Sequence, residues 1–286
     1  MTIQLLRQSY GKHRVRVSKI KRPRLDSPKN EKHELIEASV DVELEGDFAD
    51  SYTHQDNSQV VATDTCRNTV YVLAKEDPFD TIESFGVRVA EHFIATYPHV
   101  RQATIRLTEH RWHRMLESPY AFIGSDQETP TATIVTIRNS KTQVESGIAN
   151  LMIAKTTESG FSNFHRDAFC TLPDTEDRIL ATVLKADWSF TTQPDDFEEA
   201  RKAIRKAMLE TFVVHFSPSV QDTLYRMAVA ALNSVNSIDK ISLAMPNKHH
   251  LRFDLKPFDR VNDNEVFVVT DEPFGYISAT VGRTEI

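Results

Sequence analysis

The chain has 286 residues, of which 40% are hydrophobic and 26% are charged. These proportions are ordinary for a globular protein and exclude a disordered chain, and the length allows one large domain or two of moderate size. The formal net charge of -7 argues against a general nucleic-acid binder, which is usually basic. No apolar run reaches the ~18 residues of a membrane-spanning helix. We therefore expect neither nucleic acid nor a membrane as a partner.

The termini and the cysteines indicate the compartment. Cys66 and Cys170 are too few for a disulfide framework. The N-terminal residues lack the apolar region of a secretory signal, and the C-terminal VGRTEI is not the Ser-Lys-Leu peroxisomal address. We expect a cytoplasmic protein.

A basic strand and an acidic strand come first in chain order. Residues 13–22 (HRVRVSKIKR) are rich in β-branched and basic side chains. Residues 36–45 (IEASVDVELE) alternate apolar and polar side chains, which is the pattern of a strand with one buried and one solvated face. Opposite charges on neighbouring strands favour cross-strand pairing, so we predict that the two segments form an antiparallel pair.

Helices and further strands follow. Residues 80–97 place apolar side chains three or four positions apart, as an amphipathic helix does, with Asp80 as the expected N-cap and Pro98 as the stop. A shorter helix is expected over residues 65–76. Strands are expected near residues 101–114 and 130–140.

The second half repeats this order. Strands are predicted at residues 143–157 and 178–192, helices at 195–215 and at 218–235 with Pro218 near the first turn, and strands at 239–246, 249–256, 264–270 and 275–282. The repeat predicts an α+β protein made of two antiparallel sheets, each covered by helices on one face. The polar stretch at 138–143 sets the expected domains at 1–140 and 141–286. The uncovered sheet faces suggest an oligomer.

Common catalytic signatures are absent from the sequence. There is no Gly-rich phosphate-binding loop. His110 with His113, and His249 with His250, lack the nearby cysteines or carboxylates that would complete a metal site, so no metal is expected. Each lone cysteine is interpreted as a small buried hydrophobic residue.

Three polar groups interrupt apolar surroundings. VVATDT at 60–65 places Thr63 and Asp64 where a helix begins, either as a plain N-cap or as an anion-binding start. MPNKHH at 245–250 contains Asn247 and His249, either in a solvated turn or in a site. YGK at 10–12 presents Lys12, which taken alone is a surface lysine.

Together these groups resemble the signatures of the urate oxidase family, and the resemblance covers nearly the whole chain. The matching blocks, in family order, are YGK at 10–12, VVATDT at 60–65 with NTVY at 68–71, FxxFxRD at 161–167, DRILAT at 177–182, SVQ at 219–221 with TLYRMA at 223–228, PNKHH at 246–250, and NEVF at 264–267 with TVGR at 280–283. The resemblance implies tandem tunnelling-fold domains. In that family, four subunits form a homotetramer with a barrel-like tunnel, and active sites lie at subunit interfaces.

The resemblance also implies how the purine is bound. Arg178 and Gln221 are expected to hold it through the paired, planar hydrogen bonds of guanidinium and amide groups. Phe161 is expected to stack on its face. The main-chain N–H groups expected to complete the site belong to Thr63, Asp64 and Val220.

The implied reaction converts urate, dioxygen and water to 5-hydroxyisourate and hydrogen peroxide without metal or organic cofactor. Lys12, Thr63 and His249 are expected to move protons through an ordered water. Asn247, with Thr63, is expected to hold dioxygen. The Lys12 and Thr63 side chains would come from a neighbouring subunit.

The chain departs from the family pattern in two places. Asn163 stands where the family usually has Gly, two residues after Phe161, and Phe169 and Cys170 replace the usual Tyr and Thr. Two alternatives stay open. One is another tunnelling-fold enzyme that acts on pterins or purines, although the zinc ligands of the cyclohydrolases are not at the expected spacing. The other is a purine-binding module without turnover.

Overall fold

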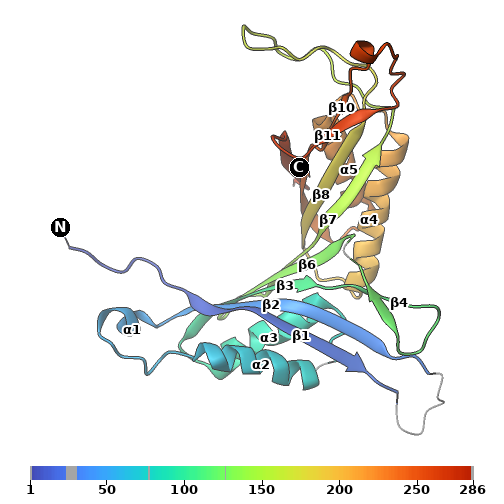
Figure 1. Ribbon diagram of the computed structural model, residues 1–286. Helices are drawn as coiled ribbons and strands as arrows, with labels where there is room; N and C mark the ends of the chain where they lie inside the picture. The colour runs from blue at the N-terminus through green and yellow to red at the C-terminus, as the bar shows by residue number, and fades with distance from the viewer. Residues whose placement is uncertain (1, 24–30, 77, 126, 285–286) are drawn as a thin grey trace. The chain divides into compact units, whose positions relative to one another are not determined.

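The computed structural model describes residues 2–23, 31–76, 78–125 and 127–284 (Figure 1). The chain divides into two compact units, the first ending at Gly147 and the second beginning at Ile148, so the division falls within strand β7 (Gln143–Lys155). Each unit combines an antiparallel sheet with helices. This is the α+β arrangement predicted from the repeated order of strands and helices.

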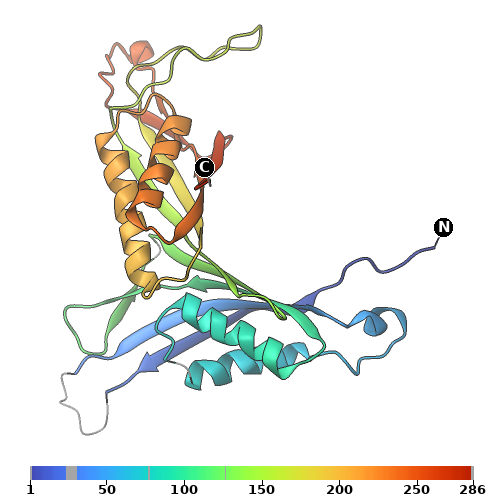
Figure 2. The same cartoon turned by 180° about the vertical axis from the view of Figure 1, so that it is seen from behind.

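The first unit has the strand order β1-β2-β3-β6. Helix α2 contacts β1, and α3 contacts β3 and β6, so both helices cover the same face of the sheet (Figures 1 and 2). The elements are β1 (Tyr10–Lys21), β2 (Glu34–Gly46), α1 (Ala49–Thr53), α2 (Thr63–Glu76), α3 (Ile82–Thr96), β3 (Val100–Glu109), β4 (Trp112–Arg114), β5 (Phe122–Gly124) and β6 (Thr129–Ile137).

The predicted pairing of the basic and acidic strands is confirmed. Strands β1 and β2 are antiparallel, with Lys21 opposite Glu34 and its Nζ 3.3 Å from that carboxylate. Arg16 pairs with Glu37 across the same two strands. The other face of β2 is half-buried at Ile36 and buried at the four apolar residues that alternate after it: Ala38, Val40, Val42 and Leu44. The period-2 alternation therefore predicted correctly which side chains of this strand face the core and which face solvent.

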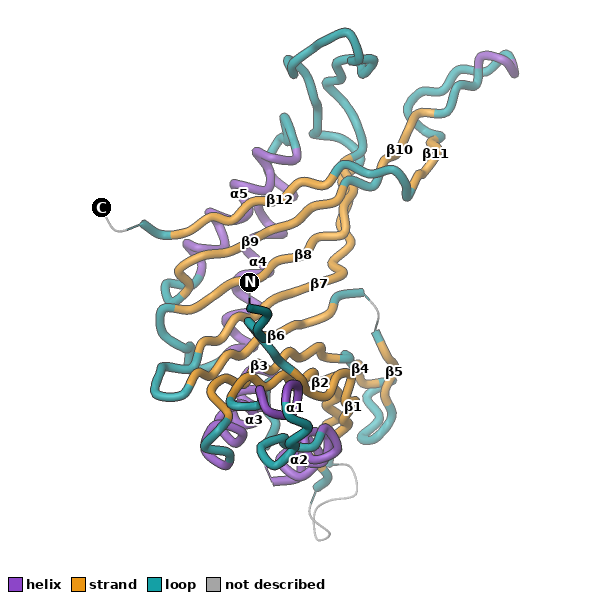
Figure 3. Tube along the Cα trace, turned by 90° about the vertical axis from the view of Figure 1, so that its left-hand side faces the viewer, coloured by secondary structure: helices purple, strands orange, loops and turns teal. Residues whose placement is uncertain are grey.

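The second unit has the strand order β7-β8-β9-β12. Helices α4 and α5 contact each other, and α5 contacts β9 and β12. Strands β10 and β11 form a separate two-stranded sheet (Figure 3). The remaining elements are β8 (Leu180–Phe190), α4 (Phe197–Val214), α5 (Val220–Ser234), β9 (Ile238–Pro246), β10 (His249–Arg252), a short 3₁₀ turn (Lys256–Phe258), β11 (Phe267–Thr270) and β12 (Tyr276–Gly282).

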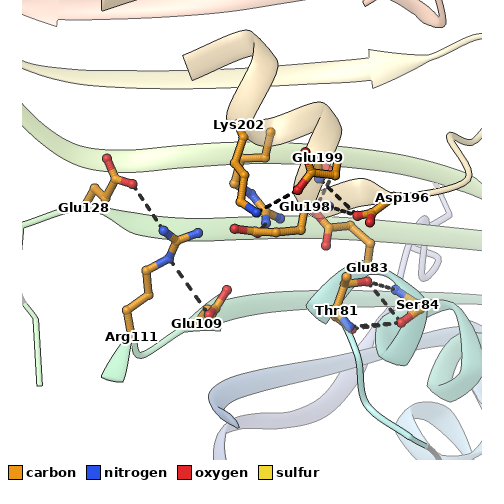
Figure 4. Close-up of polar contacts among 12 residues, drawn as sticks. Thr81, Glu83, Ser84, Glu109, Arg111, Glu128, Asp196, Glu198, Glu199 and Lys202 are labelled. Atoms are coloured by element: carbon orange, nitrogen blue, oxygen red, sulfur yellow. Dashed lines mark hydrogen bonds and ion pairs between the residues drawn. The ribbon is translucent and has the colours of Figure 1, made fainter. Parts of the chain in front are cut away.

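Helix starts differ from the sequence prediction by one or two residues. Asp80 is not the N-cap of α3; Thr81 is, and it forms a reciprocal capping box with Ser84 (Figure 4). Asp80 instead pairs with Lys21 at 2.6 Å. Pro218 directly precedes Ser219, the N-cap of α5, which agrees with its predicted place near the first turn. An aspartate and a threonine are both good caps, so the sequence alone did not separate them.

The predicted strand at residues 101–114 is wrong beyond Glu109. Strand β3 ends there, and β4 belongs to a separate two-stranded sheet with β5. The Arg111 side chain lies 3.3 Å from Glu128 and 3.9 Å from Glu109 (Figure 4). The chain therefore breaks at a charged contact rather than continuing the ladder.

Candidate active site

The start of β1 requires its glycine. A Cβ on Gly11 would lie 1.8 Å from the main-chain oxygen of Val42, far inside any real contact, so β1 approaches β2 this closely only with glycine. Lys12 follows, half-buried and opposite Val42, and the register shifts between Lys12 and Val15. A bulge of this kind redirects a side chain within a ladder. The strand thereby places Lys12 at a local irregularity.

Tyr10 links β1 to the segment that precedes α2. Its Oη accepts the Val61 N–H at 2.7 Å, and its ring packs edge-on against Phe48, with centroids 4.8 Å apart. Burial raises the pKa of Tyr10 to about 12, so the hydroxyl stays protonated. This contact holds the VVATDT segment against the strand that carries Lys12.

Helix α2 begins at Thr63, so Thr63 and Asp64 are inside its first turn and neither is the N-cap. Both residues are exposed. The Asp64 carboxylate lies 2.6 Å from Arg67 and accepts from Asn68 at 2.9 Å. First-turn N–H groups have no partner within a helix, so Thr63 and Asp64 offer main-chain donors at the helix start.

Cys66 lies one turn into α2 and is fully buried. Burial raises the pKa of its thiol to about 11, while the positive charge of Lys12 acts in the opposite direction. Helix α2 also contacts strand β1, which carries Lys12. The first unit thus brings Lys12, Thr63 and Asp64 into one neighbourhood.

In the second unit, Arg178 and Phe161 are in direct contact. The guanidinium carbon lies 5.3 Å from the ring centroid of Phe161, a cation–π geometry. Phe161 and Thr175 exchange main-chain hydrogen bonds of 2.7 and 3.0 Å, which aligns the two segments. Burial lowers the pKa of Arg178 from its usual value. A partly desolvated guanidinium beside an aromatic face suits a planar anion.

The loop after Phe161 explains one departure from the family pattern. Asn163 has a φ of 56°, in the left-handed region. Glycine is the usual residue there, and asparagine is the best-tolerated substitute. Phe164 stacks on Phe161 with centroids 4.8 Å apart and planes at 6°. The Gly-to-Asn difference therefore fits a loop of the same backbone conformation.

The first turn of α5 is anchored beside this loop. Ser219 is the N-cap and accepts the Asp222 N–H at 3.1 Å, so Val220 and Gln221 occupy the first positions of the helix. Val220 is buried, whereas Gln221 is exposed. Just before the cap, Ser217 bridges to Ser159. The start of α5 and the Phe161 segment are thus joined.

Asn247 and His249 lie together after β9. Asn247 bridges to Thr182 of β8, and its main-chain N–H donates to Gly275 at 2.8 Å. The Asn247 Nδ2 amide donates to Nδ1 of His249 at 3.3 Å. The intervening Lys248 turns away and lies 2.6 Å from Asp271. This segment is ordered by pairing on both sides, so it is not a simple solvated turn.

The structure distributes the nine expected site residues over both units. Lys12, Thr63 and Asp64 belong to the first, and the other six belong to the second. Sequence reasoning missed Ser159 and Ser217, whose bridge joins two site segments. Within the described ranges, no group of three His, Cys, Asp or Glu side chains is placed to hold a metal ion. No described helix is long and apolar enough to cross a membrane.

Comparisons with known proteins agree on one family. The uricase family model matches residues 8–135 and 144–278. The uricase of Dictyostelium discoideum is 36% identical in an alignment 286 residues long that covers 98% of each chain. The crystal structure of the uricase from Arthrobacter globiformis superposes with a TM-score of 0.94 at 36% identity, covering 99% of this chain and 96% of that one. A urate oxidase structure from Bacillus sp. TB-90 shares the fold, with a TM-score of 0.83 at 23% identity over 96% of this chain and all (100%) of that one.

The family model and the Dictyostelium relative both cover most of the chain, so the chain belongs to the uricase family. It is accordingly an oxidoreductase. The predicted resemblance is confirmed, and so is the expected fold of two repeated sheet-and-helix units.

Proposed function

We propose that this chain is a urate oxidase that works without metal or organic cofactor and releases 5-hydroxyisourate and hydrogen peroxide. The observation that carries the proposal lies in the second unit. There the Arg178 guanidinium carbon lies 5.3 Å from the centroid of the Phe161 ring, and the main-chain bridge from Ser159 to Ser217 joins this pair to the first turn of α5, which bears Gln221. A guanidinium, an amide and an aromatic face are the groups that a flat purine anion needs.

Each binding group has a defined task. Arg178 and Gln221 donate and accept the paired, in-plane hydrogen bonds along one edge of urate, and Phe161 covers its face. The Val220 N–H adds a donor from the first turn of α5. The N–H groups of Thr63 and Asp64 serve the opposite edge, because a helix start favours an anion.

The chemistry begins with proton removal. Urate, already an anion at neutral pH, loses a second proton through Lys12, Thr63, His249 and a water held between them. The electron-rich dianion transfers two electrons to dioxygen, which takes up two protons and becomes hydrogen peroxide. Water then adds to the oxidised ring and gives 5-hydroxyisourate. Asn247 holds dioxygen first and the attacking water later, supported by the amide contact that already links it to His249.

The active form is a homotetramer in which Lys12, Thr63 and Asp64 of one subunit complete the site of a neighbour. Exposed apolar side chains support an interface on the second unit. Phe169 is 91% exposed and Val261 is 80% exposed, and burying such side chains against a second copy of the chain would be favourable. Light scattering should therefore give the mass of four chains. A stable, active monomer would contradict a shared site.

Oxygen uptake tests the proposal. Purified protein stripped of metals with a chelator should consume oxygen when urate is added, and added metal or flavin should not change the rate. Uptake that depends on added metal or flavin would favour another tunnelling-fold enzyme. Tight purine binding without any uptake would identify a binding module.

A further inference from the structure

The second unit contains a cluster of buried hydroxyl groups behind the purine-binding residues. Ser159, Ser217 and Thr223 are each 0% exposed, and we call them the hydroxyl cluster. A hydroxyl buried without a hydrogen bond is costly, so three of them in one place imply that their partners matter. None of the three was expected to belong to the site.

Two members of the cluster, Ser217 and Thr223, form a chain of side-chain hydrogen bonds. The Thr223 Oγ1 donates to the Ser217 Oγ at 2.7 Å, and the Ser217 Oγ donates to the main-chain oxygen of Ser219 at 3.1 Å. Ser219 is the N-cap of α5. The Ser217–Thr223 pair therefore holds Ser219 in place, and Val220 and Gln221 directly follow Ser219 in the first turn of α5. Chains of hydrogen bonds in a low-dielectric interior reinforce one another.

Main-chain bonds connect the cluster to the Phe161 segment. The Ser217 N–H donates to the main-chain oxygen of Glu158 at 2.9 Å, and the Gly160 N–H donates to the main-chain oxygen of Ser217 at 2.8 Å. These two bonds enclose Ser159. Gly160 permits the close packing, because a Cβ there would lie 2.9 Å from the main-chain oxygen of Thr175. The start of α5 and the segment carrying Phe161 are consequently held as one piece.

Ser159 also contacts Arg178 twice. The main-chain N–H of Arg178 donates to the main-chain oxygen of Ser159 at 2.8 Å, and the Arg178 Nε donates to the Ser159 Oγ at 3.4 Å. With Nε engaged behind the site and the Phe161 ring on one face, the guanidinium has a restricted orientation. Its two terminal amino groups are left to face a ligand. A pre-oriented guanidinium loses less entropy when it binds a planar anion.

We propose that Ser159, Ser217 and Thr223 are positioning residues for urate binding, with Ser159 orienting Arg178 and the Ser217–Thr223 pair fixing the start of α5 that bears Gln221. This inference rests on the proposed urate oxidase function. The three hydroxyls do not touch the substrate. Their effect on the reaction passes through Arg178 and Gln221, so it falls on binding rather than on proton transfer.

The test compares four variants with the wild type. Ser159→Ala removes the acceptor of Arg178 Nε, and Thr223→Val removes the donor to Ser217 while keeping the side-chain shape. Thr223→Ser keeps that donor and should restore wild-type behaviour. Ser146→Ala is the matched control, because Ser146 is only 2% exposed and its Oγ donates to Glu83 at 2.7 Å within the first unit. The readouts are KM and kcat for urate, Kd for xanthine as a non-oxidised planar purine, and the unfolding temperature.

We expect Ser159→Ala and Thr223→Val to raise KM and the xanthine Kd by about tenfold, the size of a lost hydrogen bond to a charged or buried group. We expect kcat to stay within about threefold, the pattern of lost uniform binding. Unchanged KM and Kd in Ser159→Ala and Thr223→Val would overturn the inference. So would a fall in kcat as large as the rise in KM, or the same rise in KM and Kd in the Ser146→Ala control. If Ser159→Ala does not fold, the Thr223 pair decides. Wild-type protein that binds xanthine without oxidising urate would refute the proposed function instead, and the Kd values would still judge the inference.

Discussion

Tyr10→Phe removes a single oxygen at the junction between β1 and the segment before α2. That oxygen accepts the Val61 N–H at 2.7 Å, and Val61 is 6% exposed. The variant keeps the ring, which packs against Phe48. An N–H left unsatisfied in such a place costs about 1–3 kcal/mol. Each kcal/mol lowers the unfolding temperature by roughly 2–4 °C in proteins of about 150–250 residues.

The assay is thermal unfolding followed by circular dichroism, with urate turnover measured on the same samples. We expect a lower unfolding temperature and a lower kcat, because the loosened segment carries Thr63. Tyr225→Phe is the matched control, since Tyr225 is 57% exposed and should tolerate the change. Equal unfolding temperatures for Tyr10→Phe and the wild type would refute the assigned role of this hydrogen bond.

The same residue predicts a dependence on alkaline pH. Burial raises the pKa of Tyr10 from its ordinary value of 10.0 to about 12. The folded state therefore keeps a proton that the unfolded state loses, so this contribution is complete below pH ~10 and is lost as the pH rises toward ~12. The stability of the wild type should fall over this window more steeply than that of Tyr10→Phe. Parallel curves would contradict the burial of the hydroxyl.

Three further predictions concern other residues. Asn163→Gly should keep stability because φ is 56° there, whereas Asn163→Ala should cost about 1 kcal/mol by urea unfolding; equal midpoints would count against the left-handed loop. A thiol reagent at pH 8 should label Cys170 but not the buried Cys66, whose pKa is raised to about 11; labelling of both in folded protein would refute this. Lys12→Met should lower kcat by about a hundredfold with little change in the xanthine Kd, and equal losses would make Lys12 a binding residue.

The regular elements were largely predictable from the sequence, because their signals are local. The alternation in β2 and the helical period in α3 each reflect one buried face, which is set by neighbours along the chain. The exact helix starts were less accessible. Asp80 and Thr81 are both suitable caps, and the choice depended on Lys21, which pairs with Asp80 from a distant strand.

The site was predictable only in part, because its residues are joined by non-local contacts. Taken singly, Lys12 is indistinguishable from a surface lysine, and family motifs were needed to single it out. The bond from Val61 to Tyr10 and the bridge from Ser159 to Ser217 span distant parts of the sequence. A periodic pattern along the sequence does not indicate which residues from distant segments are hydrogen-bonded to each other.

The most direct test of the account follows all reactants in one vessel. Metal-stripped wild-type protein and Arg178→Gln are given urate while urate loss, oxygen consumption and peroxide formation are recorded together. The account predicts equimolar changes of all three for the wild type, and a strongly raised KM for Arg178→Gln. Urate loss without matching oxygen uptake and peroxide, or wild-type behaviour of Arg178→Gln, would contradict it.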